Sequence, residues 1–178
     1  MAREERLAAR FATELELDHK LLRDALRLWD SKRSDGTPPS RAAFAAAELK
    51  PFLPNLMIVE YETESGRYRF RLIGTAITET FKRDATGQYL DEIYAGHELQ
   101  SLREGFDAAR LTRYPKALFG TLRSPRRASL SVEGLLMPLD VTAGQNPQML
   151  IAIYFRYAED VAYSDVEFNW AAGNPASA

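Results

Sequence analysis

The apolar residues of this chain follow two periods, and the order in which these periods occur predicts the fold class. Over residues 19–32 they recur every three or four positions, which is the spacing of one face of an α-helix. Further helical patterns are expected at 41–48, 76–82, 89–93 and 97–112. Runs with the length and composition of β-strands lie near 56–62, 67–73, 116–123, 130–139 and 148–156. This order of helices and strands predicts an α+β domain.

The strands are expected to form one antiparallel sheet, because short turn-like segments join neighbouring strands. The run MLIAIYF at 149–155 is apolar at consecutive positions, so both of its faces should be covered. The run LMIVEY at 56–61 is nearly as apolar. The helices between the second and third strands can cover one face of the sheet, and the helix at 19–32 is the best candidate for the other.

The strand at 67–73 is expected to present two different faces. Side chains alternate along a strand, so the pattern places Tyr68, Phe70 and Leu72 on one face and Arg69, Arg71 and Ile73 on the other. The strand is followed directly by a turn, a short helix and a second turn.

Four residues around that helix are expected to shape the turns. Gly74 should allow the sharp turn after the strand, and Thr75 should cap the helix. Arg71 and Asp84 are expected to pair across the junction as a stabilising ion pair. The alternative is that Arg71 anchors a carboxylate or phosphate of a ligand.

Composition and charge narrow the classes of function. With 178 residues, 46% of them hydrophobic, the chain fits one globular domain with helical extensions. Its formal net charge of −2 gives no reason to expect nucleic acid or an anionic membrane as a partner. It contains no cysteine, which excludes disulfides, thiol nucleophiles and thiolate metal sites. No run of about 18 apolar residues and no secretory signal is found, so we expect a cytoplasmic protein.

Four stretches of the chain, taken in order, resemble a known family. They are PPSRAAFAAAELKPFLPNLMIVEYE, FRLIGTAI, KRDATGQYLDEI and GLLMPLD. Their order and spacing over residues 20–156 are similar to those of a PAS domain, of the compact bacterial type that often occurs without an attached output domain. The resemblance implies a five-stranded antiparallel sheet with helices on one face and an N-terminal helix on the other. It also implies sensing and protein contacts instead of catalysis.

The resemblance sets expected boundaries and structural residues. We expect residues 1–17 to form an N-terminal helical extension, 18–160 the PAS domain, and 161–178 a C-terminal helical turn and polar tail. Seven residues at motif positions are expected to be structural: Ser40, Arg41, Arg71, Gly74, Thr75, Asp84 and Gly87. Among these, Ser40 should cap the helix at 41–48.

In PAS domains the ligand pocket lies between the inner face of the sheet and the intervening helices. The residues expected there are Phe70, Leu72, Ile77, Phe81, Tyr89, Ile93, Phe106, Met137 and Tyr154. An apolar pocket with a few polar groups is a common site for a small molecule. The alternative is a core that the same residues fill completely.

The residues leave the cofactor unknown and give little support for catalysis. Haem needs an axial ligand, and the two histidines, His19 and His97, stand at the start of expected helices, where histidine is usually solvated. The chain has no GxSxG, GxGxxG, phosphate-loop or HExxH motif. We therefore expect no enzyme and no metal site.

Residues 110–127 contain six basic residues and no acidic one. The segments RSPRR and SLSVEG partly resemble the pieces that bind cyclic dinucleotides in PilZ domains, although Ser129 stands in place of an acid or amide. Arg123, Arg126 and Arg127 are therefore candidates for an anion-binding face. The alternative is a solvated hairpin turn.

The helix at 19–32 offers a possible interface through Leu21, Leu22, Leu26 and Trp29. These residues can pack on the chain's own sheet, on a second subunit, or on both, and we expect a homodimer. The function predicted is a cytoplasmic sensor or regulatory module that binds a small ligand, a partner protein of a signalling pathway, or both. Two alternatives remain: a ligand-free scaffold or localisation protein with a filled core, and an anion or cyclic-dinucleotide receptor using the basic run at 110–127.

Overall fold

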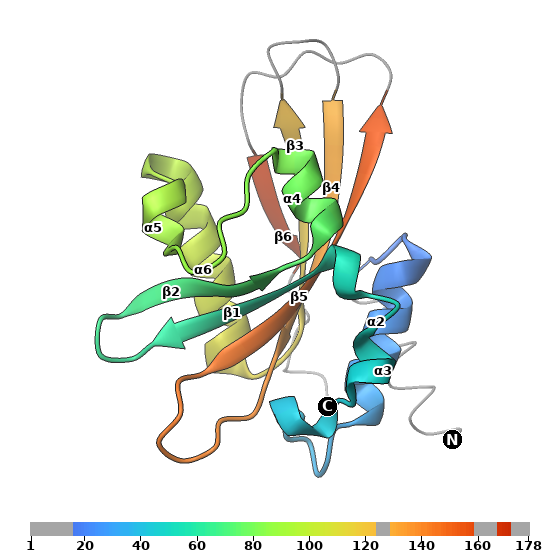
Figure 1. The fold of residues 1–178 in the computed structure, drawn as a ribbon, viewed down its shortest axis with the longest axis vertical. Helices are drawn as coiled ribbons and strands as arrows, with labels where there is room; N and C mark the ends of the chain where they lie inside the picture. The colour runs from blue at the N-terminus through green and yellow to red at the C-terminus, as the bar shows by residue number, and fades with distance from the viewer. Residues whose placement is uncertain (1–15, 124–128, 159–166, 172–178) are drawn as a thin grey trace.

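The two runs at 56–62 and 67–73 form a hairpin of β1 (Leu56–Glu62) and β2 (Arg67–Ile73). The other strands are β3 (Lys116–Arg123), β4 (Ser129–Pro138), β5 (Gln148–Ala158) and β6 (Glu167–Ala171). They join the hairpin in one antiparallel sheet of order β2-β1-β5-β4-β3-β6 (Figure 1). This structure is a computed structural model that describes residues 16–123, 129–158 and 167–171. The predicted α+β class and antiparallel pairing are confirmed.

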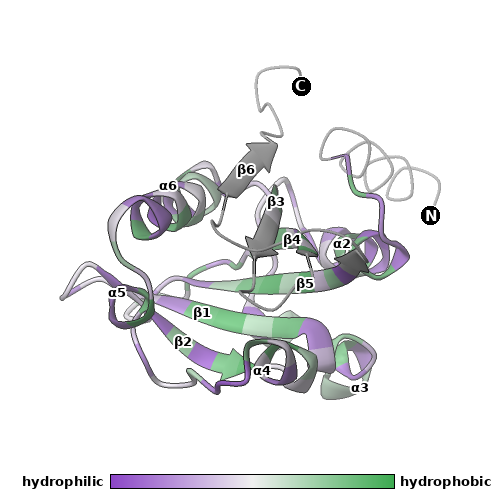
Figure 2. Cartoon of the chain, turned by 90° about the horizontal axis from the view of Figure 1, so that it is seen from above, coloured by the Kyte–Doolittle hydropathy of each residue, from purple (hydrophilic) through white to green (hydrophobic). Residues whose placement is uncertain are grey.

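The strand predicted to be covered on both faces lies inside the sheet, where β5 pairs with β1 and with β4. Its alternate residues enter two separate hydrophobic cores: Met149, Ile151 and Ile153 face one, and Leu150 and Ala152 face the other. Figure 2 shows β1 and β5 as mostly hydrophobic strands between the helices. The apolar run therefore reflects burial on both sides.

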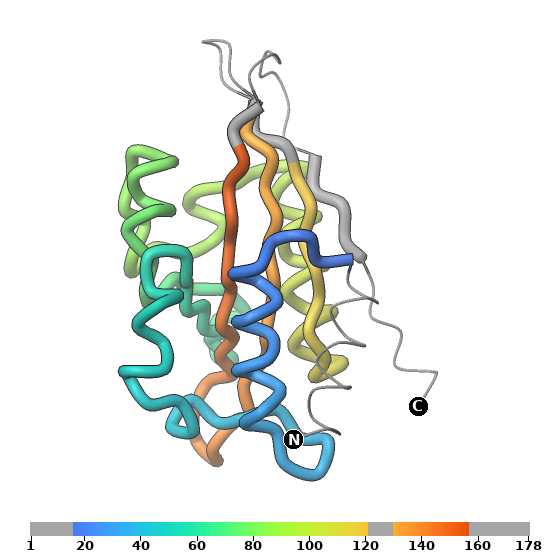
Figure 3. Tube along the Cα trace, turned by 90° about the vertical axis from the view of Figure 1, so that its right-hand side faces the viewer, coloured from blue at the N-terminus to red at the C-terminus, as the bar shows by residue number. Residues whose placement is uncertain are grey.

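Helices cover each face of the sheet. They are α2 (Lys20–Ser31), η1 (Arg41–Ala43), α3 (Ala46–Leu49), η2 (Leu53–Asn55), α4 (Thr75–Phe81), α5 (Leu90–Ile93) and α6 (Gly96–Thr112). Figure 3 shows α2 in front of β4 and β5, with α6 behind them. We call the two sides the α2 face and the α6 face. Within the part of the chain that the structure describes, no helix is both long and apolar enough to cross a bilayer.

The amphipathic helix α2 packs on the chain's own sheet. Leu22, Leu26 and Trp29 have no exposed surface, and the indole Nε1 of Trp29 donates a hydrogen bond to the Pro138 carbonyl at 2.8 Å. Leu21 is partly buried beside the same core. The helix therefore covers the second face of the sheet as predicted, and three of the four residues proposed for a dimer contact are taken up by intramolecular packing.

The start of α2 is fixed by polar contacts. The Glu133 carboxylate accepts hydrogen bonds from the Asp18 N–H at 2.7 Å and from the His19 N–H at 3.2 Å. The His19 ring stacks on Tyr154 with 3.3 Å between centroids, and its Nδ1 accepts from the Leu21 N–H. These contacts tie the first turn of the helix to β4 and β5.

The C-terminal helical turn predicted within 161–178 is wrong for the residues that can be judged. Glu167–Ala171 is strand β6, which pairs with β3 and extends the sheet to six strands. A strand edge offers unpaired N–H and C=O groups, and pairing with that edge outweighs the weak helical pattern of so short a segment. Residues 1–15, 161–166 and 172–178 of the predicted terminal segments lie outside the described residues.

Residues 41–49 form two short helical segments, η1 and α3, instead of the predicted single helix at 41–48. Ser40 precedes η1 but makes no side-chain capping bond, and Arg41 is exposed. The capping of α3 comes from its third residue, because the Glu48 carboxylate accepts the Ala45 N–H at 2.9 Å. Ser40 instead pairs through its backbone with Asp140. The interruption lets this segment follow the sheet into β1.

A β-bulge changes the faces of β2. Ile58 lies opposite Leu72 while Val59 lies opposite Phe70, so Arg71 has no partner across the hairpin. Beyond the bulge the alternation restarts with opposite sense, and Leu72 packs on the α2 face while Ile73 packs on the α6 face. The strict alternation predicted for this strand is therefore wrong after Phe70.

Gly74 has a different role from the one predicted. Its φ of −68° and ψ of 155° are open to any residue, so no special turn conformation is needed. A Cβ atom at this position would lie only 2.2 Å from the Leu53 carbonyl oxygen, and the Gly74 N–H donates to Leu56 O at 2.8 Å. Close approach to η2 therefore requires glycine. Gly74, and not Thr75, is the N-cap residue of α4.

Candidate ligand pocket

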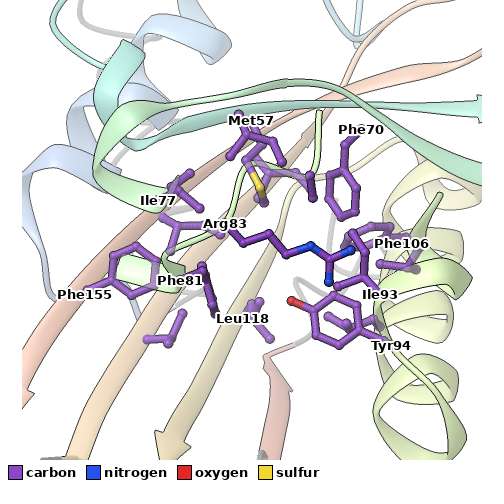
Figure 4. Close-up of a pocket in the computed structure, with 17 residues that line it drawn as sticks. Met57, Phe70, Ile77, Phe81, Arg83, Ile93, Tyr94, Phe106, Leu118 and Phe155 are labelled. Atoms are coloured by element: carbon purple, nitrogen blue, oxygen red, sulfur yellow. The ribbon is translucent and has the colours of Figure 1, made fainter. Parts of the chain in front are cut away.

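A largely apolar cavity of about 290 Å³ lies on the α6 face, between the sheet and helices α4, α5 and α6 (Figure 4). The strands contribute Met57, Phe70, Ile73, Leu118, Val132, Ile151, Ile153 and Phe155. The helices and the turn after α4 contribute Ile77, Phe81, Arg83, Ala85, Leu90, Ile93, Tyr94, Leu102 and Phe106. The lining is therefore drawn from segments far apart in sequence.

The structure brings together five of the nine residues predicted for a pocket. Phe70, Ile77, Phe81, Ile93 and Phe106 all line the cavity. Ile77 and Phe106 are almost fully buried, while Phe81 is 41% exposed and touches Phe155 edge-on at 5.7 Å between ring centroids. Phe81 therefore stands at the side of the cavity that is open to solvent.

The other four predicted residues do not line the cavity. Leu72, Met137 and Tyr154 belong to the core on the α2 face, because the β2 bulge and the alternation of β4 and β5 direct them there. Tyr89 lies outside the cavity, where its ring stacks on Arg67 at 3.7 Å and its hydroxyl donates to Glu62 at 3.1 Å. Apolar character alone does not tell which face a strand residue occupies.

Arg83 is the lining residue that the sequence analysis missed and that matters most for the chemistry of the cavity. It comes two residues after the end of α4, and Figure 4 shows its guanidinium reaching across the apolar lining toward Ile93 and Tyr94. Its Nη2 donates to the Gln88 side-chain oxygen at 2.5 Å. Lys82 and Arg83 are both exposed, but only Arg83 lines the cavity. No sequence signal distinguishes the two, because the direction of Arg83 depends on the following turn.

The turn after Arg83 is built by Asp84 and Gly87. The Asp84 carboxylate accepts the Thr86 N–H at 2.9 Å, and Thr86 lowers the pKa of that carboxyl through hydrogen bonding. Gly87 has a φ of +87°, which favours glycine, and its N–H donates to Phe70 O at 2.7 Å. The turn therefore returns the chain to the edge of β2 and forms one side of the cavity.

The ion pair predicted between Arg71 and Asp84 is absent from the structure. Arg71 is the bulged residue of β2, and its side chain is exposed, while Asp84 is engaged in its own turn. The bulge turns Arg71 away from the junction where Asp84 lies. Arg71 does not line the cavity either, so its predicted role as a ligand anchor finds no support in this pocket.

A polar cluster holds α6 against the hairpin. The Tyr68 hydroxyl donates to Asp107 at 2.6 Å, and Arg110 donates to both Tyr68 and Asp107 at 3.1 and 2.8 Å. Arg110 also lies 3.9 Å from the centre of the Tyr61 ring. Burial, reinforced by the bond to Asp107, raises the pKa of Tyr68 far above its usual value, so the phenol remains a donor. The α6 wall is therefore anchored at the sheet.

The basic run at 110–127 does not form one free anion-binding face among its described members. Arg110 is engaged by Asp107, and Arg113 pairs with Asp140 at 2.6 Å. Lys116 is buried in β3, and burial lowers its pKa. Arg126, Arg127 and the side chain of Arg123 lie outside the described part of the structure.

Neither histidine stands where a haem in this cavity would need an axial ligand. His97 is exposed near the start of α6, and His19 stacks on Tyr154 on the α2 face. Neither lines the cavity. The described lining is apolar with one cationic side chain, and it contains no nucleophile, base and acid that could form a catalytic triad.

Comparison with known proteins agrees with this architecture. The family model of the PAS domain matches residues 17–154, which is more than half of the chain. No curated protein matches the chain significantly. PAS domains are in general sensory or regulatory modules and are typically not catalytic. On the strength of that match and of the sheet and helices described above, the chain belongs to the PAS domain family.

Proposed function

We propose that the cavity on the α6 face binds a small, mainly apolar ligand and that its occupancy is relayed to a partner protein. The observation that carries this proposal is the cavity itself, with about 290 Å³ of space lined almost entirely by apolar side chains. Pockets for drug-sized ligands start at about 300 Å³, and a cavity of about 150 Å³ can hold benzene. A small organic molecule therefore fits.

The contrast with the other face supports a binding role for the cavity. Protein interiors are normally packed with few voids larger than a water molecule. The core beneath α2 is closer to this rule, because the cavity lined by Trp29, Phe44 and Met137 holds only about 10 Å³. A sheet that is tightly packed on one side and hollow on the other favours a ligand over the filled scaffold.

A route for the relay is supported by two strands that serve both faces. Ile153 and Phe155 line the cavity, while Tyr154 between them stacks on His19 at the start of α2. Glu133, on the neighbouring strand β4, holds the same turn. A ligand that shifts β5 would move the start of α2, provided that it binds one arrangement more tightly than the other.

The test is mass spectrometry of the purified full chain under native and denaturing conditions, with two variants. Ile151→Phe places a larger side chain in the cavity, and Leu111→Phe changes a residue that is 69% exposed on α6. We expect a small molecule to be released on denaturation from the wild type and from Leu111→Phe but not from Ile151→Phe.

Two observations together would contradict the proposal. The wild-type protein would carry no small molecule, and no compound in a panel of small apolar and amphipathic molecules would raise its Tm. The search would then turn to proteins that bind the domain without a ligand.

A further inference from the structure

The lining of the cavity carries a single charge. Arg83 is the one charged side chain among the described residues that line it, and Tyr94 is the one that bears a hydroxyl. Figure 4 shows the guanidinium extended over the apolar lining, with the Tyr94 hydroxyl beside it. An uncharged apolar ligand would gain no ionic contact from a cation at this position.

The charge of Arg83 is not neutralised by an acid within the described residues. Its side chain donates a hydrogen bond to the neutral amide oxygen of Gln88, and none of the ion pairs among the described residues includes Arg83. Glu98 does not line the cavity, but its negative charge helps to raise the pKa of the Tyr94 phenol. Arg83 is an exposed residue that also lines the cavity, and a guanidinium in that position without a carboxylate partner is a ready anion site.

Building on the proposed ligand pocket, we infer that the ligand is an amphipathic monoanion, with an apolar body in the cavity and a carboxylate held by Arg83 and Tyr94. The planar fork of arginine matches a carboxylate, whose two oxygens accept two parallel N–H bonds. A dianion such as a phosphate monoester would bring a second charge, for which the described lining offers no second cation.

Tyr94 can add a neutral donor to the same head group. Burial raises the pKa of its phenol above the ordinary value, with a further contribution from Glu98, so the hydroxyl keeps its proton at neutral pH. The volume of about 290 Å³ is roughly twice the cavity of about 150 Å³ that holds benzene. A medium-chain or aromatic carboxylic acid has the matching size and charge.

The experiment compares octanoate with 1-octanol by calorimetric titration of the full chain. Octanoate should bind the wild type, and Arg83→Gln should weaken it by about 10- to 100-fold while leaving octanol unchanged, because a charge-assisted bond is lost. Tyr94→Phe should weaken octanoate by about 3- to 10-fold. Arg71→Gln is the matched control: it removes the same charge from an exposed residue outside the cavity and should change neither affinity.

Two results would overturn the inference. Equal binding of octanoate and octanol, with no effect of Arg83→Gln, would refute the anionic head group and leave the apolar pocket intact. No binding of octanoate to the wild type would refute the carboxylate inference, and the mass-spectrometric experiment with Ile151→Phe then judges the pocket independently. Arg83→Lys keeps the charge without the fork, so we expect an intermediate affinity, and its circular dichroism checks folding.

Discussion

The two faces of the sheet are built from the same strands yet differ in how they are filled. On the α2 face, Leu22, Leu26 and Trp29 leave almost no space against β4 and β5. On the α6 face, the helices rest on the rim and leave a cavity of about 290 Å³. A large indole near the C-terminal end of α2 closes one side, while the three helices α4, α5 and α6 around the other side leave the cavity between them. The difference indicates that the α2 face contributes mainly to stability, while the α6 face leaves the space that the proposed ligand would fill.

The largest effect is expected where the packing is tightest. Trp29→Ala should destabilise the fold by about 3 to 5 kcal/mol, because it leaves a large void and an unpaired Pro138 carbonyl. At about 2 to 4 °C per kcal/mol, Tm should fall by roughly 6 to 20 °C. Phe81→Ala, at the open side of the cavity, should cost less than half as much. Equal losses of unfolding free energy for the two variants, measured by urea denaturation, would show that the two faces do not differ in packing.

The second-largest effect is the difference in folding stability between variants at two neighbouring residues of β5. Leu150→Phe adds volume to the packed α2 face and should cost about 1 to 3 kcal/mol. Ile151→Phe makes a similar change toward the cavity, so its cost should stay below about 1.5 kcal/mol. Thermal denaturation of the ligand-free proteins gives both values. A greater loss for Ile151→Phe than for Leu150→Phe would mean that the cavity is not available space.

The smallest effect concerns the ion pairs at the rim of the α6 face. Arg67 donates to Asp91 on α5 at 3.1 Å, and this hydrogen bond holds the pKa of Asp91 below its usual value. A carboxyl with a lowered folded-state pKa stabilises above its unfolded pKa, and that contribution is lost as the pH falls through the folded value. The Tm difference between wild type and Arg67→Gln should therefore persist from neutral pH down to about pH 4 and shrink as the pH falls further.

A second contact of Arg67 accounts for the part of this Tm difference that remains at low pH. Arg67 also lies over the Tyr89 ring at 3.7 Å, an interaction that does not depend on a carboxylate. Asp91→Asn, which leaves the ring contact intact, isolates the carboxylate. A Tm difference for Asp91→Asn that grows on acidification would contradict the assignment.

The sequence predicted the positions of the helices and strands far better than it predicted which face of the sheet each strand residue occupies. Local periodicity predicts the hairpin of β1 and β2, the helix α2 that carries Trp29, and the burial of β5 on both faces. It does so because backbone geometry sets the 3.6-residue spacing of a helix and the 2-residue spacing of a strand. The prediction failed for Leu72, Met137 and Tyr154, since one bulge and an unknown covering face decide where a strand residue points. It failed for β6 because pairing with β3 overrode a short helical pattern.

By itself, the sequence determined strands β1 to β5 and the helices α2, α4, α5 and α6, that β5 is buried on both faces, and that α2 covers one of them. These properties depend on neighbouring residues and on their apolar spacing. Only the tertiary structure decided that the α6 face is hollow and that Arg83 reaches into it. A cavity is the space left between segments distant in sequence, and the direction of Arg83 follows from the Asp84–Gly87 turn returning to β2. Neither property is encoded at any single position, so the chemistry of the site appears only when the chain is folded.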